Sequence, residues 1–269
     1  MSGCFSIRLK TWKMDQGRAR EGRVFTKGDG YGESRLWAPE CHKYRGRYYL
    51  FYSADHGCAV AVGDSPLGPF ANPTKEPLVR EGRYENGDAM LCIDNSLVLA
   101  ENGDPWMVYS RGGRACLVRL TEDLQHVLPE TSFFLFGDLE PWQHGIEEGP
   151  FILRENNRWY CFFSGDDCRS PDYSVGVGVA DSLRGPWRRI HGYRFLHRVG
   201  GLTGTGHGTP FKDAAGLWRY IFHAHYSREF FGPRCTYVNR FRFDSRSGRP
   251  ELLTDDRPLP CRITREMQE

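Results

Sequence analysis

The chain has 269 residues and a mass of 30.9 kDa, which is enough to bury a full hydrophobic core in one all-β domain. Its 36 Lys and Arg nearly balance its 34 Asp and Glu, and no basic run stands out, so the charge pattern predicts no nucleic-acid and no membrane partner. No stretch of 18 apolar residues and no secretory signal segment follows Met1, so the chain as written is predicted to be cytoplasmic. The nine cysteines are odd in number and lack C-x-x-C spacing, which indicates reduced packing residues.

One sequence phrase recurs four times: an apolar strand, a polar turn, and an aromatic strand that ends in Ser or His. In every copy the last residue follows the first by 16 positions, which predicts a strict register. The expected hairpin tips carry Gly or Asn, for which a positive φ costs little. The copies are 37–53, 94–110, 148–164 and 207–223, with tips at Arg45-Gly46, Asn102-Gly103, Asn156-Asn157 and Ala215-Gly216.

Units of this kind, repeated at intervals of fewer than sixty residues, are typical of β-propeller blades and less so of a β-sandwich. We expect one all-β domain, a five-bladed β-propeller with an incomplete first blade. The expected boundaries are 1–34 for the remainder of blade one, 35–87 for blade two, 88–145 for blade three, 146–200 for blade four, 201–250 for blade five and 251–269 for a tail.

The first residues of the four copies are Trp37, Asp94, Glu148 and His207. Because the innermost strand of each blade lines the central channel, these side chains are predicted to converge on the axis in a small polar pocket. Two neighbouring carboxylates raise each other's cost of ionising, so one of them can stay protonated and act as a general acid in glycoside hydrolysis. Solvated, inert carboxylates that merely line the channel are the alternative.

The motifs that open these repeats resemble those of glycoside hydrolase family 43. They are WAPE at 37–40, Ile-Asp at 93–94, Glu-Glu-Gly-Pro at 147–150 and Gly-His-Gly at 206–208; they occur in family order, and the resemblance covers residues 6–243. The resemblance implies an inverting glycosidase for pentose-containing glycans, of the xylosidase or arabinofuranosidase type. It implies an oligosaccharide or polysaccharide partner and no required cofactor.

By this resemblance Glu148 is the general acid, and Asp94 orients the acid and raises its pKa. Trp37 lines the substrate pocket. His207 lies near the axis, where many members hold a structural calcium ion. Arg234 opens a segment similar to the family's R-x-T strand, whose Arg reaches a sugar hydroxyl; a surface arginine is the alternative.

Three further residues compete for these roles. Arg242 lies on the same predicted strand as Arg234. Glu147 should point away from Glu148 because side chains alternate along a strand. Glu40 belongs to the WAPE motif but falls outside the predicted axial register.

The family's third carboxylate is an Asp in blade one that acts as general base. Repeat spacing places it before Met1, and Asp15 and Asp29 lie in polar stretches typical of loops. General-base assistance contributes about 10²–10⁴-fold, so we expect a poor hydrolase as the chain is written. An N-terminal shortening would also have removed any export signal. The rival hypotheses are a non-catalytic carbohydrate-binding propeller and a protein-interaction propeller, the latter supported by fold alone.

Overall fold

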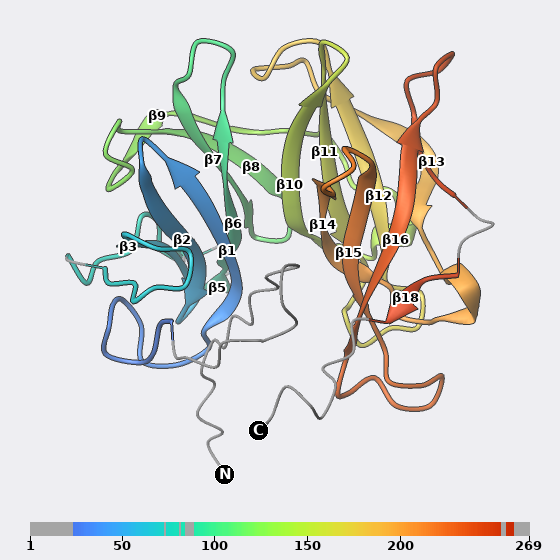
Figure 1. Ribbon diagram of the computed structural model, residues 1–269, viewed down its shortest axis with the longest axis horizontal. Helices are drawn as coiled ribbons and strands as arrows, with labels where there is room; N and C mark the ends of the chain where they lie inside the picture. Colours follow the sequence, from blue (N-terminus) through green and yellow to red (C-terminus); the bar gives the residue numbers. More distant parts are fainter. Residues whose placement is uncertain (1–23, 73, 81, 84–88, 254–256, 261–269) are drawn as a thin grey trace. The chain divides into compact units, whose positions relative to one another are not determined.

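The computed structural model describes residues 24–72, 74–80, 82–83, 89–253 and 257–260 (Figure 1). The chain divides into two compact units, the first ending at Phe134 and the second beginning at Leu135. Nearly all regular structure is β-strand, as predicted. Among the described residues, no helix has the length and apolar character needed to cross a membrane.

The first unit opens with an antiparallel three-stranded sheet in the order β1 (Trp37–Tyr44), β2 (Arg47–Ala54) and β3 (Gly57–Gly63). The middle strand is rich in Tyr, Leu and Phe, and its last six residues are buried. A cluster of buried side chains that includes Val24, Phe25 and Phe70 packs against this sheet.

The second sheet of this unit has the order β6 (Cys92–Leu99), β7 (Pro105–Arg111), β8 (Ala115–Leu120) and β9 (Val127–Phe134). A separate short pair, β4 (Gly82–Arg83) and β5 (Ala89–Met90), precedes it. One hydrophobic core joins the two larger sheets, with Phe51 and Val60 from the first and Met107, Tyr109 and Val118 from the second.

The second unit begins with a 3-10 turn, η1 (Pro141–Gln143), and an antiparallel sheet. Its order is β10 (Glu147–Glu155), β11 (Arg158–Gly165), β12 (Ser174–Ala180) and β13 (Arg188–Leu196). Glycines alternate along β12 because aromatic rings cover it. A Cβ at Gly176 would lie 2.6 Å from the Phe163 ring, and one at Gly178 would lie 2.2 Å from the Phe136 ring.

The last sheet follows the 3-10 turn η2 (Val199–Gly201). It contains β14 (Gly206–Lys212), β15 (Trp218–Ala224), β16 (Cys235–Phe243), β17 (Pro250–Leu252) and β18 (Leu259–Pro260), with β17 and β18 both paired to β16. Aromatic side chains of both sheets, among them Tyr160, Phe162, Phe195 and Tyr220, form one core in this unit. The seven cysteines within the described residues are free thiols, as predicted, and four of them are buried.

The predicted hairpins are confirmed. Arg45-Gly46 joins β1 to β2 with φ values of 45° and 85°, and Asn156-Asn157 joins β10 to β11 with 50° and 59°. In the other two hairpins Gly103 and Gly216 supply the positive φ, at 83° and 76°. The turn residues therefore fix where each repeat reverses direction.

The predicted strict register is wrong in two of the four repeats. Trp37 and Glu148 do pair with the closing residues of their repeats, but in the other two copies the paired residues are Ile93 and Gly206, one position before Asp94 and His207. A β-bulge lies at the start of every first strand, so the bulge alone does not separate the repeats. The physical reason is the length of the hairpin turn: two residues separate the last paired positions in the first and third repeats, and five separate them in the second and fourth. As a result the bulge follows Trp37 and Glu148 but contains Asp94 and His207, so the four residues are not equivalent.

The residue in the bulge has a left-handed backbone in each repeat: Ala38 (φ 44°), Asp94 (60°), Gly149 (56°) and His207 (44°). This conformation costs a non-glycine residue roughly 1–2 kcal/mol. In two of the repeats a hydrogen bond with the neighbouring repeat offsets part of that cost. The Asp94 N–H donates to Ser53 Oγ at 2.7 Å, and the His207 N–H donates to Ser164 Oγ at 2.8 Å.

Candidate active site

Glu148 lies at the start of β10, partly buried, where the bulge interrupts the strand. The Tyr173 hydroxyl donates a hydrogen bond of 2.6 Å to its Oε1. When Glu148 is protonated, an oxygen that already accepts this bond is a poor place for the proton, so Oε2 carries it. Tyr173 thereby selects the oxygen from which Glu148 can deliver a proton.

Tyr173 is itself held tightly. It is fully buried, and its ring stacks on the His223 imidazole with 5.6 Å between ring centroids and 5° between planes. The backbone of Gly206 is also close, since an added Cβ there would lie 2.2 Å from the Tyr173 ring. A glycine at this position is what allows the ring to lie beside β14.

His223 closes the fourth repeat on β15, where the first three repeats have Ser53, Ser110 and Ser164. Burial, reinforced by the positive charge of Arg234, lowers the pKa of His223 to about 2, so its imidazole is neutral. Arg234 Nη1 lies 3.1 Å from His223 Nε2. Because a guanidinium only donates, Nε2 is the acceptor and the ring proton sits on Nδ1.

Arg234 precedes β16 and is exposed, with its guanidinium directed at His223. Burial raises the pKa of the Cys168 thiol; the negative charge of Glu148 raises it further, and the positive charge of Arg234 lowers it. The carboxylate and the guanidinium thus both act electrostatically on one thiol. The competing candidate, Arg242, lies on β16 opposite Glu251, at the other end of the strand from Arg234.

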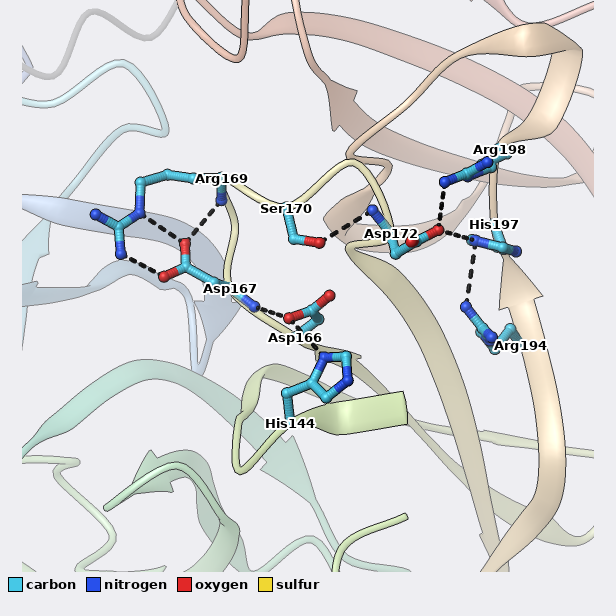
Figure 2. Close-up of polar contacts among 9 residues, drawn as sticks. All are labelled: His144, Asp166, Asp167, Arg169, Ser170, Asp172, Arg194, His197 and Arg198. Carbon is cyan, nitrogen blue, oxygen red and sulfur yellow. Dashed lines mark hydrogen bonds and ion pairs between the residues drawn. The ribbon is translucent and has the colours of Figure 1, made fainter. Parts of the chain in front are cut away.

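The connection from β11 to β12, residues 166–173, carries both Cys168 and Tyr173. Figure 2 shows how three aspartates and their partners hold it in shape. Asp166 Oδ1 lies 3.0 Å from His144 Nδ1 and accepts the Asp167 N–H at 2.8 Å. Asp167 accepts two hydrogen bonds of 2.8 Å from Arg169, and Asp172 lies between His197 (3.1 Å) and Arg198 (2.7 Å).

These contacts favour the ionised aspartates. The hydrogen bond from Arg169 lowers the pKa of Asp167 to about 2, and the hydrogen bond with His197 lowers that of Asp172. For Asp166, burial alone would raise the pKa, but hydrogen bonds with Ser170 and the Asp167 amide outweigh it, and the pKa is lowered. All three carboxylates are therefore charged near neutral pH, and the connection keeps its shape there.

Glu147 points into a different environment from Glu148. It is 1% exposed, and its Oε2 accepts bonds from Arg189 (2.7 and 3.1 Å) and from Gln143 (3.0 Å). The Arg189 guanidinium also lies over the Phe136 ring, 4.6 Å from its centroid. A buried carboxylate that is already held in an ion pair is not available to a substrate, so the adjacent Glu148 is left as the candidate acid.

In the first unit, Trp37 begins β1 and is 41% exposed, with its ring 6.1 Å from that of His56. Asp94 is 7% exposed in the bulge of β6. Ser53 links the two: its backbone pairs with Trp37 and its hydroxyl accepts the Asp94 N–H. Glu40, two residues past the bulge, has its Oε1 3.6 Å from His42 Nε2.

His207 belongs with Glu148 in the second unit. A Cβ at Gly149, the residue after Glu148, would lie 3.2 Å from the His207 ring, and the rings of His207 and His223 are 6.3 Å apart. Calcium takes six to eight oxygen ligands. Within the described ranges no group of three or more His, Cys, Asp or Glu is placed to hold a metal ion. The described residues around His207 therefore do not fit a calcium site.

Of the five residues predicted from the sequence, Glu148, His207 and Arg234 form one cluster in the second unit, and Trp37 and Asp94 form another in the first. Sequence reasoning missed two members of the second-unit cluster. His223 carried a signal, because it breaks the serine pattern of the repeats. Tyr173 carried none, since it sits at the end of a polar stretch with no periodicity.

Comparison with known proteins places the chain in a family. The sequence pattern of "Glycosyl hydrolases family 43" matches residues 6–246. The chain belongs to glycosyl hydrolase family 43.

Two curated relatives are similar over much of the chain. The "Beta-D-galactofuranosidase xynD" of Aspergillus niger is 28% identical over 203 residues, which cover 73% of this chain and 56% of the relative. The "Extracellular exo-alpha-(1->5)-L-arabinofuranosidase ArbA" of Cellvibrio japonicus is 29% identical over 187 residues, covering 61% and 52%. The chain thus spans about half the length of the curated relatives it matches.

A solved structure is also similar. The endo-1,4-beta-xylanase from Bacteroides thetaiotaomicron is 29% identical, with a TM-score of 0.77 over 88% of this chain and 82% of that one. The predicted all-β propeller class is confirmed. Five blades and an incomplete first blade stay predictions; most of the predicted first blade lies outside the described residues.

Proposed function

We propose that this chain is a glycosidase that hydrolyses O-glycosidic bonds of xylosyl or arabinofuranosyl glycans, with Glu148 as its general acid. Family membership supports a glycosidase, and similar proteins are an arabinofuranosidase, a galactofuranosidase and a xylanase by name. The observation that carries the assignment of Glu148 is its 2.6 Å hydrogen bond from Tyr173, because that bond leaves the acidic proton on one defined oxygen.

In this proposal Glu148 Oε2 gives its proton to the oxygen of the departing sugar as the glycosidic bond breaks. The electron pair of that bond leaves with the protonated oxygen, and the sugar ring passes through an oxocarbenium-like state. Water bonds to the anomeric carbon from the opposite face and releases a proton to a base. Attack from the opposite face inverts the configuration at that carbon. None of the described residues is assigned to that base.

The other residues receive their roles from the family resemblance. Asp94 raises the pKa of the acid and orients it, Trp37 packs on the sugar, and Arg234 donates to a sugar hydroxyl. Arg234 is supported over Arg242 because it contacts His223, whose ring stacks on the tyrosine that binds Glu148. The role of Asp94 rests on the resemblance, since Asp94 and Glu148 belong to different units.

The test is hydrolysis of xylosides, arabinofuranosides and galactofuranosides by the parent chain and by Glu148→Gln. A nitrophenolate leaves without much help from an acid, whereas a sugar needs its oxygen protonated. The variant should therefore lose about 10²–10⁴-fold on disaccharides and much less on nitrophenyl glycosides. Glu155→Gln, at the far end of β10, is the matched control and should behave as the parent.

Equal losses on both kinds of substrate would remove Glu148 from the role of acid. Binding of pentose oligosaccharides without turnover of any substrate would instead support the non-catalytic carbohydrate-binding propeller.

A further inference from the structure

The loop between β15 and β16 exposes three aromatic side chains within six residues. Tyr226 is 62% exposed, Phe230 62% and Phe231 48%. The loop extends beyond the sheet in Figure 1 (orange). Single exposed apolar residues are ordinary, but a group of large aromatic rings at one place marks a binding surface. We call residues 226–231 the aromatic loop.

Hydrogen bonds hold the aromatic loop in a defined shape. The Ser227 N–H donates to the Phe230 carbonyl at 3.1 Å, and Ser227 Oγ accepts the N–H groups of Glu229 (3.2 Å) and Phe230 (3.1 Å). Phe231 packs edge-on against the buried His225, with 6.1 Å between ring centroids. The rings are thus presented by a preformed turn, which reduces the entropy lost when a ligand binds.

The aromatic loop is connected to the cluster around Glu148. His225, at its start, donates from Nε2 to the carbonyl of Cys168 at 2.9 Å, in the connection that carries Tyr173. Arg234 follows the loop and contacts His223, whose ring stacks on Tyr173. The aromatic loop and the candidate acid therefore belong to one continuous set of contacts in the second unit.

We propose that Tyr226, Phe230 and Phe231 form a platform that binds sugar rings of the glycan chain beyond the residue whose bond is cleaved. This inference rests on the proposed function and names a second binding region for the same substrate. The apolar faces of sugar rings pack on aromatic rings, and the intervening Arg228 and Glu229 carry opposite charges. Because one positive and one negative residue cancel in net charge, the aromatic loop suits a neutral oligosaccharide better than an anionic polymer or an anionic lipid surface.

The test measures binding by calorimetry in the Glu148→Gln chain, so that the ligand is not consumed. The ligands are xylo- and arabino-oligosaccharides of increasing length, starting from the monosaccharide. With the platform intact, affinity should rise with chain length. Changing Tyr226, Phe230 and Phe231 together to Ala should weaken binding of the longest chains by at least about tenfold, since one buried aromatic ring supplies that much. Monosaccharide binding should not change.

Phe211→Ala is the matched control, because Phe211 is 39% exposed on β14 of the same sheet and pairs with the start of β15, away from the aromatic loop. Phe211→Ala should leave the increase of binding affinity with oligosaccharide length unchanged. If the triple variant unfolds, Phe230→Ala alone replaces it, since the turn uses only the backbone of Phe230.

The inference is overturned if the Glu148→Gln chain with an intact aromatic loop binds longer chains more tightly and the aromatic variants made in it do so equally well. If the Glu148→Gln chain with an intact aromatic loop binds no oligosaccharide of any length, both the inference and the proposed function fail. Sedimentation velocity tests a further case. If the parent self-associates and the aromatic variants do not, the aromatic loop binds a second copy of the chain, which would also overturn the inference.

Discussion

The neutral imidazole of His223 makes the stability of the second unit sensitive to mild acid. Its pKa in the folded chain is lowered to about 2, against an ordinary value of 6.5. Below pH 6.5 the unfolded chain therefore takes up a proton at this residue that the folded chain does not. Because the unfolded state binds more protons, the free energy of unfolding must fall as the pH falls, down to the folded pKa.

The size of the effect follows from one proton. Between pH 7 and pH 5, a histidine that titrates at 6.5 only when unfolded lowers the free energy of unfolding by at most about 2 kcal/mol. The figure is an upper bound because His223 is partly buried rather than fully enclosed. This pH range lies above the ordinary pKa of the aspartates around residues 166–172, so their protonation does not contribute to the loss.

The assay is urea denaturation at pH 7, 6 and 5 for the parent, for His223→Gln and for His126→Gln. Glutamine cannot take up the proton, so His223→Gln should flatten the dependence of the unfolding free energy on pH, whatever its stability at pH 7. His126 is exposed and lies in the first unit, so its variant is the control and should keep the parent's slope. An unchanged slope in His223→Gln would refute the reasoning.

Three further changes test the packing around the candidate acid. Gly206→Ala places a methyl group against the Tyr173 ring and should cost about 1–3 kcal/mol of stability, measured by thermal unfolding, whereas the same change at Gly137, which has open space and no positive φ, should cost less. Arg189→Ala removes the guanidinium that pairs with the buried Glu147 and should cost about 3–5 kcal/mol, much of it restored when Glu147→Leu is added. No restoration would contradict a buried ion pair. Ser164→Ala removes the acceptor for a bulge amide and should cost about 1–3 kcal/mol; no loss would mean that water satisfies that amide.

The parts of the fold that local chemistry determines were predictable. Hairpin positions followed from turn residues such as Arg45-Gly46 and Asn156-Asn157, because few residues accept a positive φ without cost. Motif order predicted the family that the comparison later showed.

The register at the start of each first strand was not predictable from spacing. Four intervals of 16 residues looked equivalent, yet Asp94 and His207 lie one position further along their strands than Trp37 and Glu148, because their hairpins have longer turns. The number of residues in a turn depends on how the two strands pair, and the spacing of the repeats does not reveal it. Tyr173 escaped notice for a related reason: its contact with Glu148 depends on the path of an irregular loop.

In two of the bulges the serine that accepts the bulge amide belongs to the preceding repeat, as Ser53 does for Asp94 and Ser164 does for His207. A candidate functional residue and its support are therefore encoded in different copies of the repeat. If one whole repeat were exchanged between relatives, the candidate functional residue would be transferred without the serine that accepts its backbone amide. The segment that can be transplanted intact runs from the second strand of one repeat through the first strand of the next, and chimaeras cut at those points should retain the bulge geometry.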